Sequence, residues 1–233
     1  ADYNARWSGF RPQDAVLTPY CMKLKLLRYR TEFSLAPTMS GAVMKVCVAD
    51  SADRPVFSVL PFDFHSEIRV NERETTSSTT APYRDDFRIY FVFAFDCGIG
   101  GEMRDRGCQK TESVGVYLDS RRYTVRIATS YISEEQAMLN LRRETEGKTY
   151  EEIESLAVSA WEELLSRVNI RADEQVMRTF YSCMYRAFVF PNRFYETDAC
   201  GKNIHIDPET LTVKDGVAYT NNGFWDTYRT VYP

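Results

Sequence analysis

The sequence predicts an α+β fold in which an antiparallel β-sandwich is followed by helices. From residue 20 to residue 128, apolar residues recur mostly at every second position, which is typical of half-buried strands. After Ile132 the spacing changes to the three-and-four period of amphipathic helices. Several strands joined by polar loops favour an antiparallel sandwich, and the later helices form a second part of the chain.

The individual strands are predicted from apolar residues that alternate with polar ones. Residues 22–26 and 42–48 form two such runs, and residues 123–127 form another. The strongest run is residues 87–95, whose odd positions are all large and apolar. We expect those odd positions to face a core and the even positions to turn partly outward.

Three segments are predicted to be loops or turns. Residues 71–82 are rich in Thr and Ser and are expected to form a loop. Residues 98–101 contain three glycines, but a charged turn and not a helix follows them, so a hairpin tip is favoured over a phosphate-binding loop. Residues 211–219 are predicted to form a hairpin around Asp215-Gly216.

Capping residues predict where three helices begin. Ser133 with Gln136, and Thr149 with Glu152, have the spacing of a capping box, and Asp173 is a third cap. Pro191 ends the third helix near Val189, because proline lacks the backbone donor. The second helix is expected to bury one face made of Ile153, Leu156, Ala157, Ala160, Trp161, Leu164 and Val168. The third is expected to bury Val176, Met177, Phe180, Met184, Ala187 and Phe188.

Composition limits the classes of partner. The 233 residues carry a net charge of -4, which argues against nucleic acid or an anionic membrane surface as the main partner. No apolar run reaches the length of a membrane span. The sequence opens at Ala1 without an initiator methionine or a signal peptide, and residues 221–233 stop shortly after a new element begins, so we expect sequence to be missing at both ends. The localisation cannot be read from these residues.

Cysteine and histidine do not predict a metal site. The six cysteines include no close CxxC pair, which argues against a zinc ribbon or a thioredoxin-type site. Cys97 and Cys108 flank a loop and could form a bridge in an oxidising compartment, although buried free thiols are favoured. His65 and His205 each lie two residues from a carboxylate, but no third ligand is evident, so hydrogen-bonded histidines are expected.

The most concentrated chemistry lies in residues 224–229, after a long polar loop. Trp225 offers a flat apolar face for a sugar, Asp226 can accept hydrogen bonds from sugar hydroxyls, and Arg229 can hold the aspartate in place. The alternative is structural: Asp226 begins a helix and pairs with Arg229, while Trp225 belongs to a core. Composition alone favours this alternative.

Four blocks of sequence resemble the family 92 glycoside hydrolases, which are calcium-dependent exo-acting α-mannosidases. The first two are SYISEEQAMLNL, at residues 130–141, and AWEELLSRV, at residues 160–168. The others are RTFYSCMYRAFVFPNRF, at residues 178–194, and GFWDTYRTVYP, at residues 223–233. They occur in the family's order, which is more specific than any single block, whereas MKLKLLRYRTEFSL at residues 22–35 is only loosely similar to the family.

The resemblance implies an N-terminal β-sandwich followed by an (α/α)6 barrel. Residues 1–130 would then be a sandwich that lacks its N-terminal part, and residues 131–170 would be linker helices. Residues 171–233 would start the catalytic barrel, with most barrel helices beyond Pro233. The family's glycine-rich segment would precede Ala1, and a secreted or cell-envelope protein is expected.

The resemblance also implies a chemistry. Family members cleave terminal α-mannose from glycans with inversion, using a carboxylic acid and a carboxylate far enough apart to admit water. The acid, the base and most ligands of a calcium ion would lie beyond Pro233, so this chain alone is expected to be inactive and to supply no metal ligand. Within it, Asp226 would bind mannose, Arg229 would support Asp226, and Trp225 would form a wall of the pocket. Mannose-containing glycans are the implied partners.

Two other functions remain open. A noncatalytic carbohydrate-binding or scaffold protein could retain the sandwich and helices without an acid/base pair. The second alternative is an (α/α) barrel glycosidase of another specificity, for example one that acts on α-glucosides. Gly223 and Tyr232 stand where serine and histidine are common in the family, and residues 195–210 are less typical of it.

Overall fold

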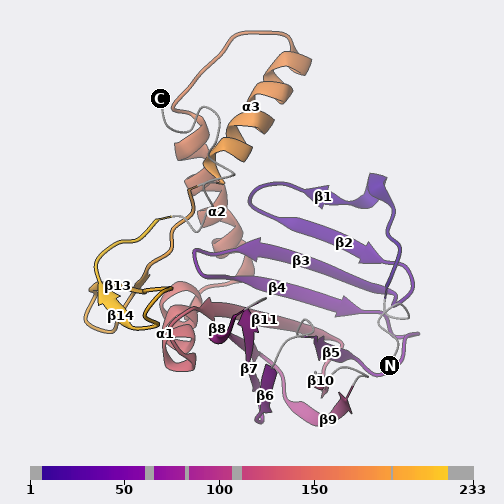
Figure 1. Cartoon of the computed structure of the whole chain (residues 1–233). Helices are drawn as coiled ribbons and strands as arrows, with labels where there is room; N and C mark the ends of the chain where they lie inside the picture. Colours follow the sequence, from indigo (N-terminus) through magenta and orange to yellow (C-terminus); the bar gives the residue numbers. More distant parts are fainter. Residues whose placement is uncertain (1–6, 61–65, 82–83, 107–111, 190, 220–233) are drawn as a thin grey trace. The chain divides into compact units, whose positions relative to one another are not determined.

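The computed structural model describes residues 7–60, 66–81, 84–106, 112–189 and 191–219 (Figure 1). The chain divides into two compact units, Ala1–Val158 and Ser159–Pro233. The first holds the strands of the predicted sandwich and the helical residues up to Val158, and the second holds the rest of the helix at residues 150–165, one further helix and a small sheet. None of the helices in these described ranges is long and apolar enough to cross a membrane.

Two antiparallel sheets form the first unit, which confirms the predicted sandwich. The larger sheet has eight strands in the order β1-β2-β3-β4-β11-β8-β7-β6. They are β1 (Val16–Leu17), β2 (Met22–Leu26), β3 (Thr31–Pro37), β4 (Gly41–Val48), β6 (Ser66–Val70), β7 (Glu74–Ala81), β8 (Arg84–Phe95) and β11 (Arg122–Ser130). The smaller sheet has the order β5-β10-β9, with β5 (Val56–Val59), β10 (Glu112–Leu118) and β9 (Ile99–Arg106). A short 3₁₀ turn, Pro12–Asp14, precedes β1.

The main core lies between these two sheets. Alternate residues of β10 are completely buried there, and they pack with residues of β4, β8 and β11. Phe57 on β5 meets Phe95 on β8 edge to face, with ring centroids 5.3 Å apart. The period of two predicted this core, because it places every second side chain of a strand on one face.

The opposite face of the larger sheet is also covered, by α1 (Glu134–Thr145) (Figure 1). Val92 on β8 and Ala128 on β11 are buried against Ala137 and Leu141 of this helix. The expectation that the even positions of residues 87–95 turn outward is therefore wrong at Val92. The alternation described one buried face correctly, but it could not show that a helix from later in the chain covers the other.

Residues 71–82 do not form the predicted loop, because β7 occupies most of them. This strand pairs with β6 on one side and β8 on the other. Thr75, Thr76, Ser77 and Ser78 are all buried. The β-branched threonines favour an extended backbone, and pairing on both edges satisfies the backbone groups, so a polar composition is compatible with an interior strand.

Residues 98–101 are likewise not a hairpin tip. They lead from β8 in the larger sheet to β9 in the smaller one, where β9 pairs with β10 and not with β8. The glycines make room for an ion pair: a Cβ on Gly100 would lie 2.2 Å from Nη2 of Arg54 and 2.3 Å from Oδ1 of Asp119. A Cβ here would therefore displace the Arg54–Asp119 ion pair, whose side chains are exposed and can shift.

The three predicted helix starts are confirmed. The backbone N–H of Gln136 donates to Ser133 Oγ at 3.1 Å, at the start of α1. For α2 (Tyr150–Leu165), the Glu152 carboxylate and the Thr149 side chain and backbone form the capping box. For α3 (Glu174–Phe188), Asp173 Oδ1 accepts from Val176 N–H at 2.9 Å.

The predicted buried faces of α2 and α3 are largely wrong. Of the residues expected inside on α2, only Ile153 is buried, and Leu156 is 55% exposed. None of the α3 residues is buried, and Val176 is 49% exposed. An amphipathic pattern identifies a face that can pack, but it does not supply the element that covers it.

The second unit contains a small antiparallel sheet, β12 (Glu196–Thr197), β13 (Asn203–Ile206) and β14 (Val213–Asp215). The predicted hairpin over residues 211–219 is wrong, because β14 pairs with β13 and not with residues 217–219. Gly216, with φ +105°, follows β14, and its N–H donates to the carbonyl of Asn203 at 2.8 Å. The glycine thus ends a strand and does not turn a hairpin.

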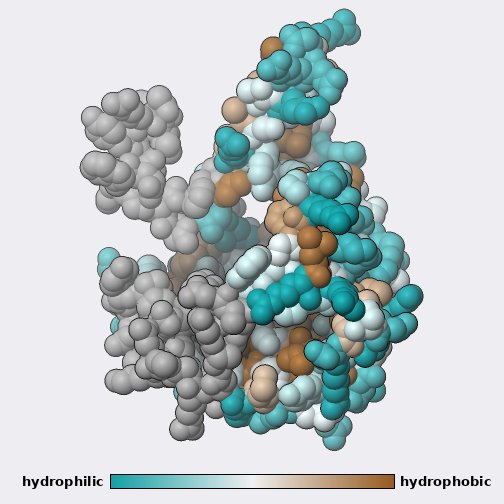
Figure 2. All heavy atoms as spheres, turned by 90° about the vertical axis from the view of Figure 1, so that its right-hand side faces the viewer, coloured by the Kyte–Doolittle hydropathy of each residue, from teal (hydrophilic) through white to brown (hydrophobic). Residues whose placement is uncertain are grey.

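Among the described residues, the surface is mainly polar on the side drawn in Figure 2. Hydrophilic side chains predominate there, and hydrophobic ones emerge in small separate patches. Single exposed apolar side chains are normal on a globular protein and do not by themselves mark an interface.

Candidate functional site

The three residues that the sequence singles out, Trp225, Asp226 and Arg229, lie outside the described residues. The last described residue before them is Tyr219, six positions ahead of Trp225. The described segment that precedes these three residues is residues 191–219 of the second unit.

Tyr219 is held beside residues 193 and 194, near the start of this segment. It forms an isolated antiparallel bridge with Arg193, and the N–H of Phe194 donates to the carbonyl of Ala218 at 2.9 Å. Backbone pairing thus brings residues 193–195 next to Tyr219, although they are 24 to 26 positions apart in the sequence.

Side chains complete this arrangement. The Arg193 guanidinium carbon lies 4.1 Å from the centre of the Tyr195 ring, a cation–π distance. Its Nε donates to the carbonyl of Tyr195 at 3.1 Å, and its Nη2 donates to Thr197 Oγ1 at 3.3 Å. The rings of Tyr195 and Tyr219 meet edge to face, with centroids 5.6 Å apart and an interplanar angle of 81°. A hydrogen bond with the Tyr195 side chain raises the pKa of Tyr219.

A compact turn joins β13 to β14 in the same unit. The Asp207 carboxylate binds the Lys214 ammonium group and also accepts the backbone N–H groups of Glu209 and Thr210, at 2.8 and 3.1 Å. Lys214, followed by the two backbone donors, holds the pKa of Asp207 far below its usual range. An aspartate with these partners closes a turn, and it is not poised to accept a proton from a substrate.

Of the two histidines, only His205 lies among the described residues. His205 Nδ1 lies 3.2 Å from the carbonyl oxygen of Gly216, which confirms the expected hydrogen-bonded histidine, and His65 lies outside the described residues. Cys108 also lies outside them, so the Cys97–Cys108 bridge stays a prediction. Within the ranges that the structure describes, no group of three or more His, Cys, Asp or Glu side chains could hold a metal ion. These described residues therefore do not fit a calcium site.

A cleft of about 1000 Å³ opens in the sandwich between β2–β4 and β5. Its floor is apolar and includes Phe33, Met44 and Phe57. Asp53 is the one carboxylate among its described lining residues. Glycoside hydrolysis by the usual mechanism needs two carboxyl groups on opposite sides of the scissile bond, so this cleft lacks that machinery.

A shallow groove of about 670 Å³ lies in the second unit, between the end of α2 and Tyr181 on α3. It contains two carboxylates, Glu162 and Glu163. Neighbouring residues on a helix point in different directions, and Glu163 lies 3.8 Å from the Arg167 guanidinium. The groove therefore does not present a facing pair of carboxylates.

The cluster of Arg193, Tyr195 and Tyr219 was not predicted from the sequence. Arg193 and Tyr195 are two positions apart, as residues on one face of an extended segment are, and this could have indicated that they are neighbours. Nothing local in the sequence indicates Tyr219 as the third member. The position of Tyr219 is set by its single backbone bridge to Arg193.

Comparison with known proteins gives a family. Residues 136–233 match the sequence model of the glycosyl hydrolase family 92 catalytic domain. A fungal relative, described as an uncharacterized secreted glycosidase of Arthroderma benhamiae, is 31% identical over 78 residues, which are 31% of this chain and 10% of the relative.

Solved structures extend the similarity to nearly the whole chain. A family GH92 inverting mannosidase of Bacteroides thetaiotaomicron is 30% identical, with a TM-score of 0.83, over 97% of this chain and 33% of that protein. An α-mannosidase of the same family and species, also solved with mannoimidazole, has a TM-score of 0.81 in that complex at 18% identity, over 95% of this chain and 32% of the other. At that identity the second comparison supports the fold alone.

This chain therefore spans about one third of the length of the solved relatives. The sequence model matches the part that begins in α1, and the solved structures match the sandwich as well. The four blocks of sequence, the sandwich followed by helices, and these matches agree. Residues 136–233 thus match the catalytic domain of glycoside hydrolase family 92, and the chain shares the fold of a solved inverting mannosidase of that family.

Proposed function

We propose that the protein carrying this chain hydrolyses terminal α-mannosides of glycans with inversion at the anomeric carbon. The observation that carries the proposal is the similarity, at 30% identity over 97% of this chain, to an inverting mannosidase. The match of residues 136–233 to a catalytic domain supports it independently. Because this chain spans one third of that relative, the activity is proposed for the full-length protein.

The proposed contribution of this chain is to bind the sugar. Asp226 would accept hydrogen bonds from hydroxyl groups of the terminal mannose, and Arg229 would hold that carboxylate in position. Trp225 would place an apolar ring against the C–H groups of the sugar. The acid and the base, which must lie far enough apart to admit a water molecule, would come from residues after Pro233.

Calcium is proposed as the cofactor. Calcium prefers several oxygen ligands, and vicinal sugar hydroxyls can complete such a set. The described residues include no group of three or more His, Cys, Asp or Glu side chains that could hold a metal ion, and most of the ligands are proposed to lie outside this chain. A secreted or cell-envelope location is proposed as well, and the description of the fungal relative as secreted supports it.

Incubation of the purified full-length protein with α-linked mannobioses tests the proposal. Proton NMR should show mannose released first as the anomer of opposite configuration to the glycosidic bond, and chelation by EDTA should abolish the release. Retention of configuration would contradict the inverting mechanism. If mannobioses stay intact and α-glucosides are cleaved, the proposed specificity for mannose is wrong and the protein is a glycosidase of another specificity. Binding of mannosides without cleavage would favour the noncatalytic alternative.

A further inference from the structure

Arg193, Tyr195 and Tyr219 form a cluster, here called the aromatic platform, that the proposed binding of the terminal mannose does not use. Tyr219 is 57% exposed, although its backbone is fixed by the bridge to Arg193. In an edge-to-face pair each ring keeps at least one face free of its partner. A tyrosine ring is thus presented to solvent by a backbone that is held in place.

The platform is ordered by contacts among its own members. Arg193 lies over Tyr195, and its Nε donates to the Tyr195 carbonyl. Tyr195 meets Tyr219 edge to face, with ring centroids 5.6 Å apart. These contacts limit the rotamers of both tyrosines before any ligand arrives, which lowers the entropy lost on binding.

The chemistry of the platform suits a pyranose. An exposed aromatic face can stack on the axial C–H face of a sugar, while phenol hydroxyls provide hydrogen bonds at its edge. The platform also lies close in sequence to the proposed mannose pocket. The six residues from Tyr219 to Trp225 can span at most about 20 Å, which is the reach of a short oligosaccharide.

We infer that the aromatic platform binds a sugar unit on the leaving-group side of the terminal mannose, with Tyr219 as the stacking residue. The inference rests on the proposed function, because it extends that substrate from a terminal mannose to a longer glycan. It predicts that Tyr219 contributes to the cleavage of oligosaccharides, but not to the cleavage of a mannoside whose leaving group is a single atom.

The test compares two substrates on the full-length protein. α-Mannosyl fluoride occupies the terminal mannose site alone, whereas an α-linked mannotriose also reaches the platform. Tyr219→Ala should lower kcat/KM for mannotriose about tenfold and leave that for the fluoride within about twofold. Tyr219→Leu keeps apolar bulk without an aromatic face and should behave like Tyr219→Ala, whereas Tyr219→Phe should retain most of the activity.

Tyr29→Ala is the matched control, because Tyr29 is also exposed, at 41%, and lies in the sandwich. It should leave both substrates unaffected. Equal losses on both substrates, or no loss on either for Tyr219→Ala and Tyr219→Leu, would overturn the inference and leave the proposed function intact. A wild-type protein inert towards both substrates would instead overturn the proposed function, and the inference with it.

Discussion

Lys23 on β2 and Glu154 on α2 form an ion pair, with Nζ and Oε1 2.7 Å apart. A second pair, Lys45 with Glu151, joins β4 to the same helix at 2.6 Å. Ile153, between the two glutamates, is buried with Ala36 and Val43 of the sheet. The start of α2 therefore belongs to the sandwich, held by an apolar contact with charge pairs at its edge.

The first prediction is that the stability of the sandwich falls at acid pH. Lys23 holds the pKa of the Glu154 carboxyl below its ordinary value of 4.5. Because this pKa is lower in the folded chain than in the unfolded one, the contribution of Glu154 is fully present above about pH 4.5 and is lost as the pH falls through the folded pKa. Urea unfolding of the 233-residue chain between pH 7 and pH 3 measures this.

Glu154→Gln is the variant that isolates this contribution. Its free energy of unfolding should be lower than that of the wild type at pH 7, and the two should converge towards pH 3. Lys23, whose pKa is raised, stays charged over this range and adds no pH dependence of its own. Parallel curves at all pH values would contradict the role of this pair.

The second prediction concerns Gly41 at the start of β4. A Cβ at this position would lie 1.9 Å from the carbonyl oxygen of Ile127, and backbone cannot move aside as a flexible side chain can. Gly41→Ala should therefore destabilise the sandwich by roughly 2 kcal/mol or more. Gly9→Ala is the control, since nothing lies within 4 Å of its Cβ position. Equal melting temperatures for the two variants would refute this close approach.

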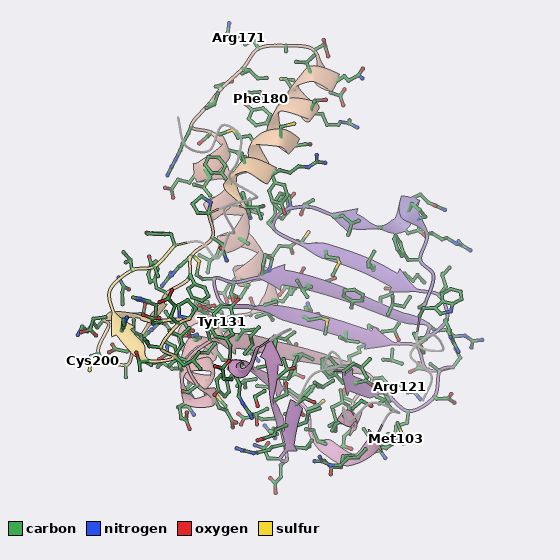
Figure 3. The ribbon with its side chains drawn as sticks, viewed as in Figure 1. Met103, Arg121, Tyr131, Arg171, Phe180 and Cys200 are labelled. Carbon is green, nitrogen blue, oxygen red and sulfur yellow. The ribbon has the colours of Figure 1, made fainter. Side chains whose placement is uncertain are left out.

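The third prediction concerns Arg121, at the turn between β10 and β11 (Figure 3). Its guanidinium group donates to the carbonyls of Ala49, Ala52 and Asp53, at 2.9 to 3.2 Å. Lysine carries a single ammonium group and cannot reproduce this fork, so Arg121→Lys should cost about 1 to 2 kcal/mol. Chemical denaturation measures the cost, and Arg122→Lys, the exposed neighbour, should change stability by less than about 0.5 kcal/mol. An Arg121→Lys protein as stable as the wild type would argue against this contact.

The fourth prediction concerns Trp161 and Tyr185, whose rings lie 4.9 Å apart between α2 and α3. Trp161 is only half buried, so its loss should cost less than that of a core tryptophan. Trp161→Ala should lower the stability of the helical pair by about 1 to 2 kcal/mol, and Trp161→Phe by less. Hydrogen exchange at α3 amides is the measurement, and unchanged protection in Trp161→Ala would show that the ring contact stabilises nothing.

Local pattern was sufficient for much of the fold. The strands with a clear period of two and the three capped helices could be predicted, because alternation and capping depend on neighbouring residues. The predictions that were wrong concern features that depend on residues distant in the sequence. Thr75 is buried because β6 and β8 pair with β7, and Gly100 lies beside Arg54 and Asp119, which are 46 and 19 positions away in the sequence.

The candidate site divides in the same way. Family blocks led to Trp225, Asp226 and Arg229, which lie outside the described residues and stay predictions. The bridge between Arg193 and Tyr219 could not be predicted from local sequence patterns, because it joins residues 26 positions apart. Neither spacing nor composition could have predicted that contact.

The most direct test of the central claim is the steady-state rate of mannose release by the full-length protein and its Asp226→Ala variant. If Asp226 binds the terminal mannose, kcat/KM should fall about 100-fold while the melting temperature stays within a few degrees of the wild type. An Asp226→Ala protein that releases mannose at the wild-type rate would contradict the claim that this chain supplies the sugar pocket.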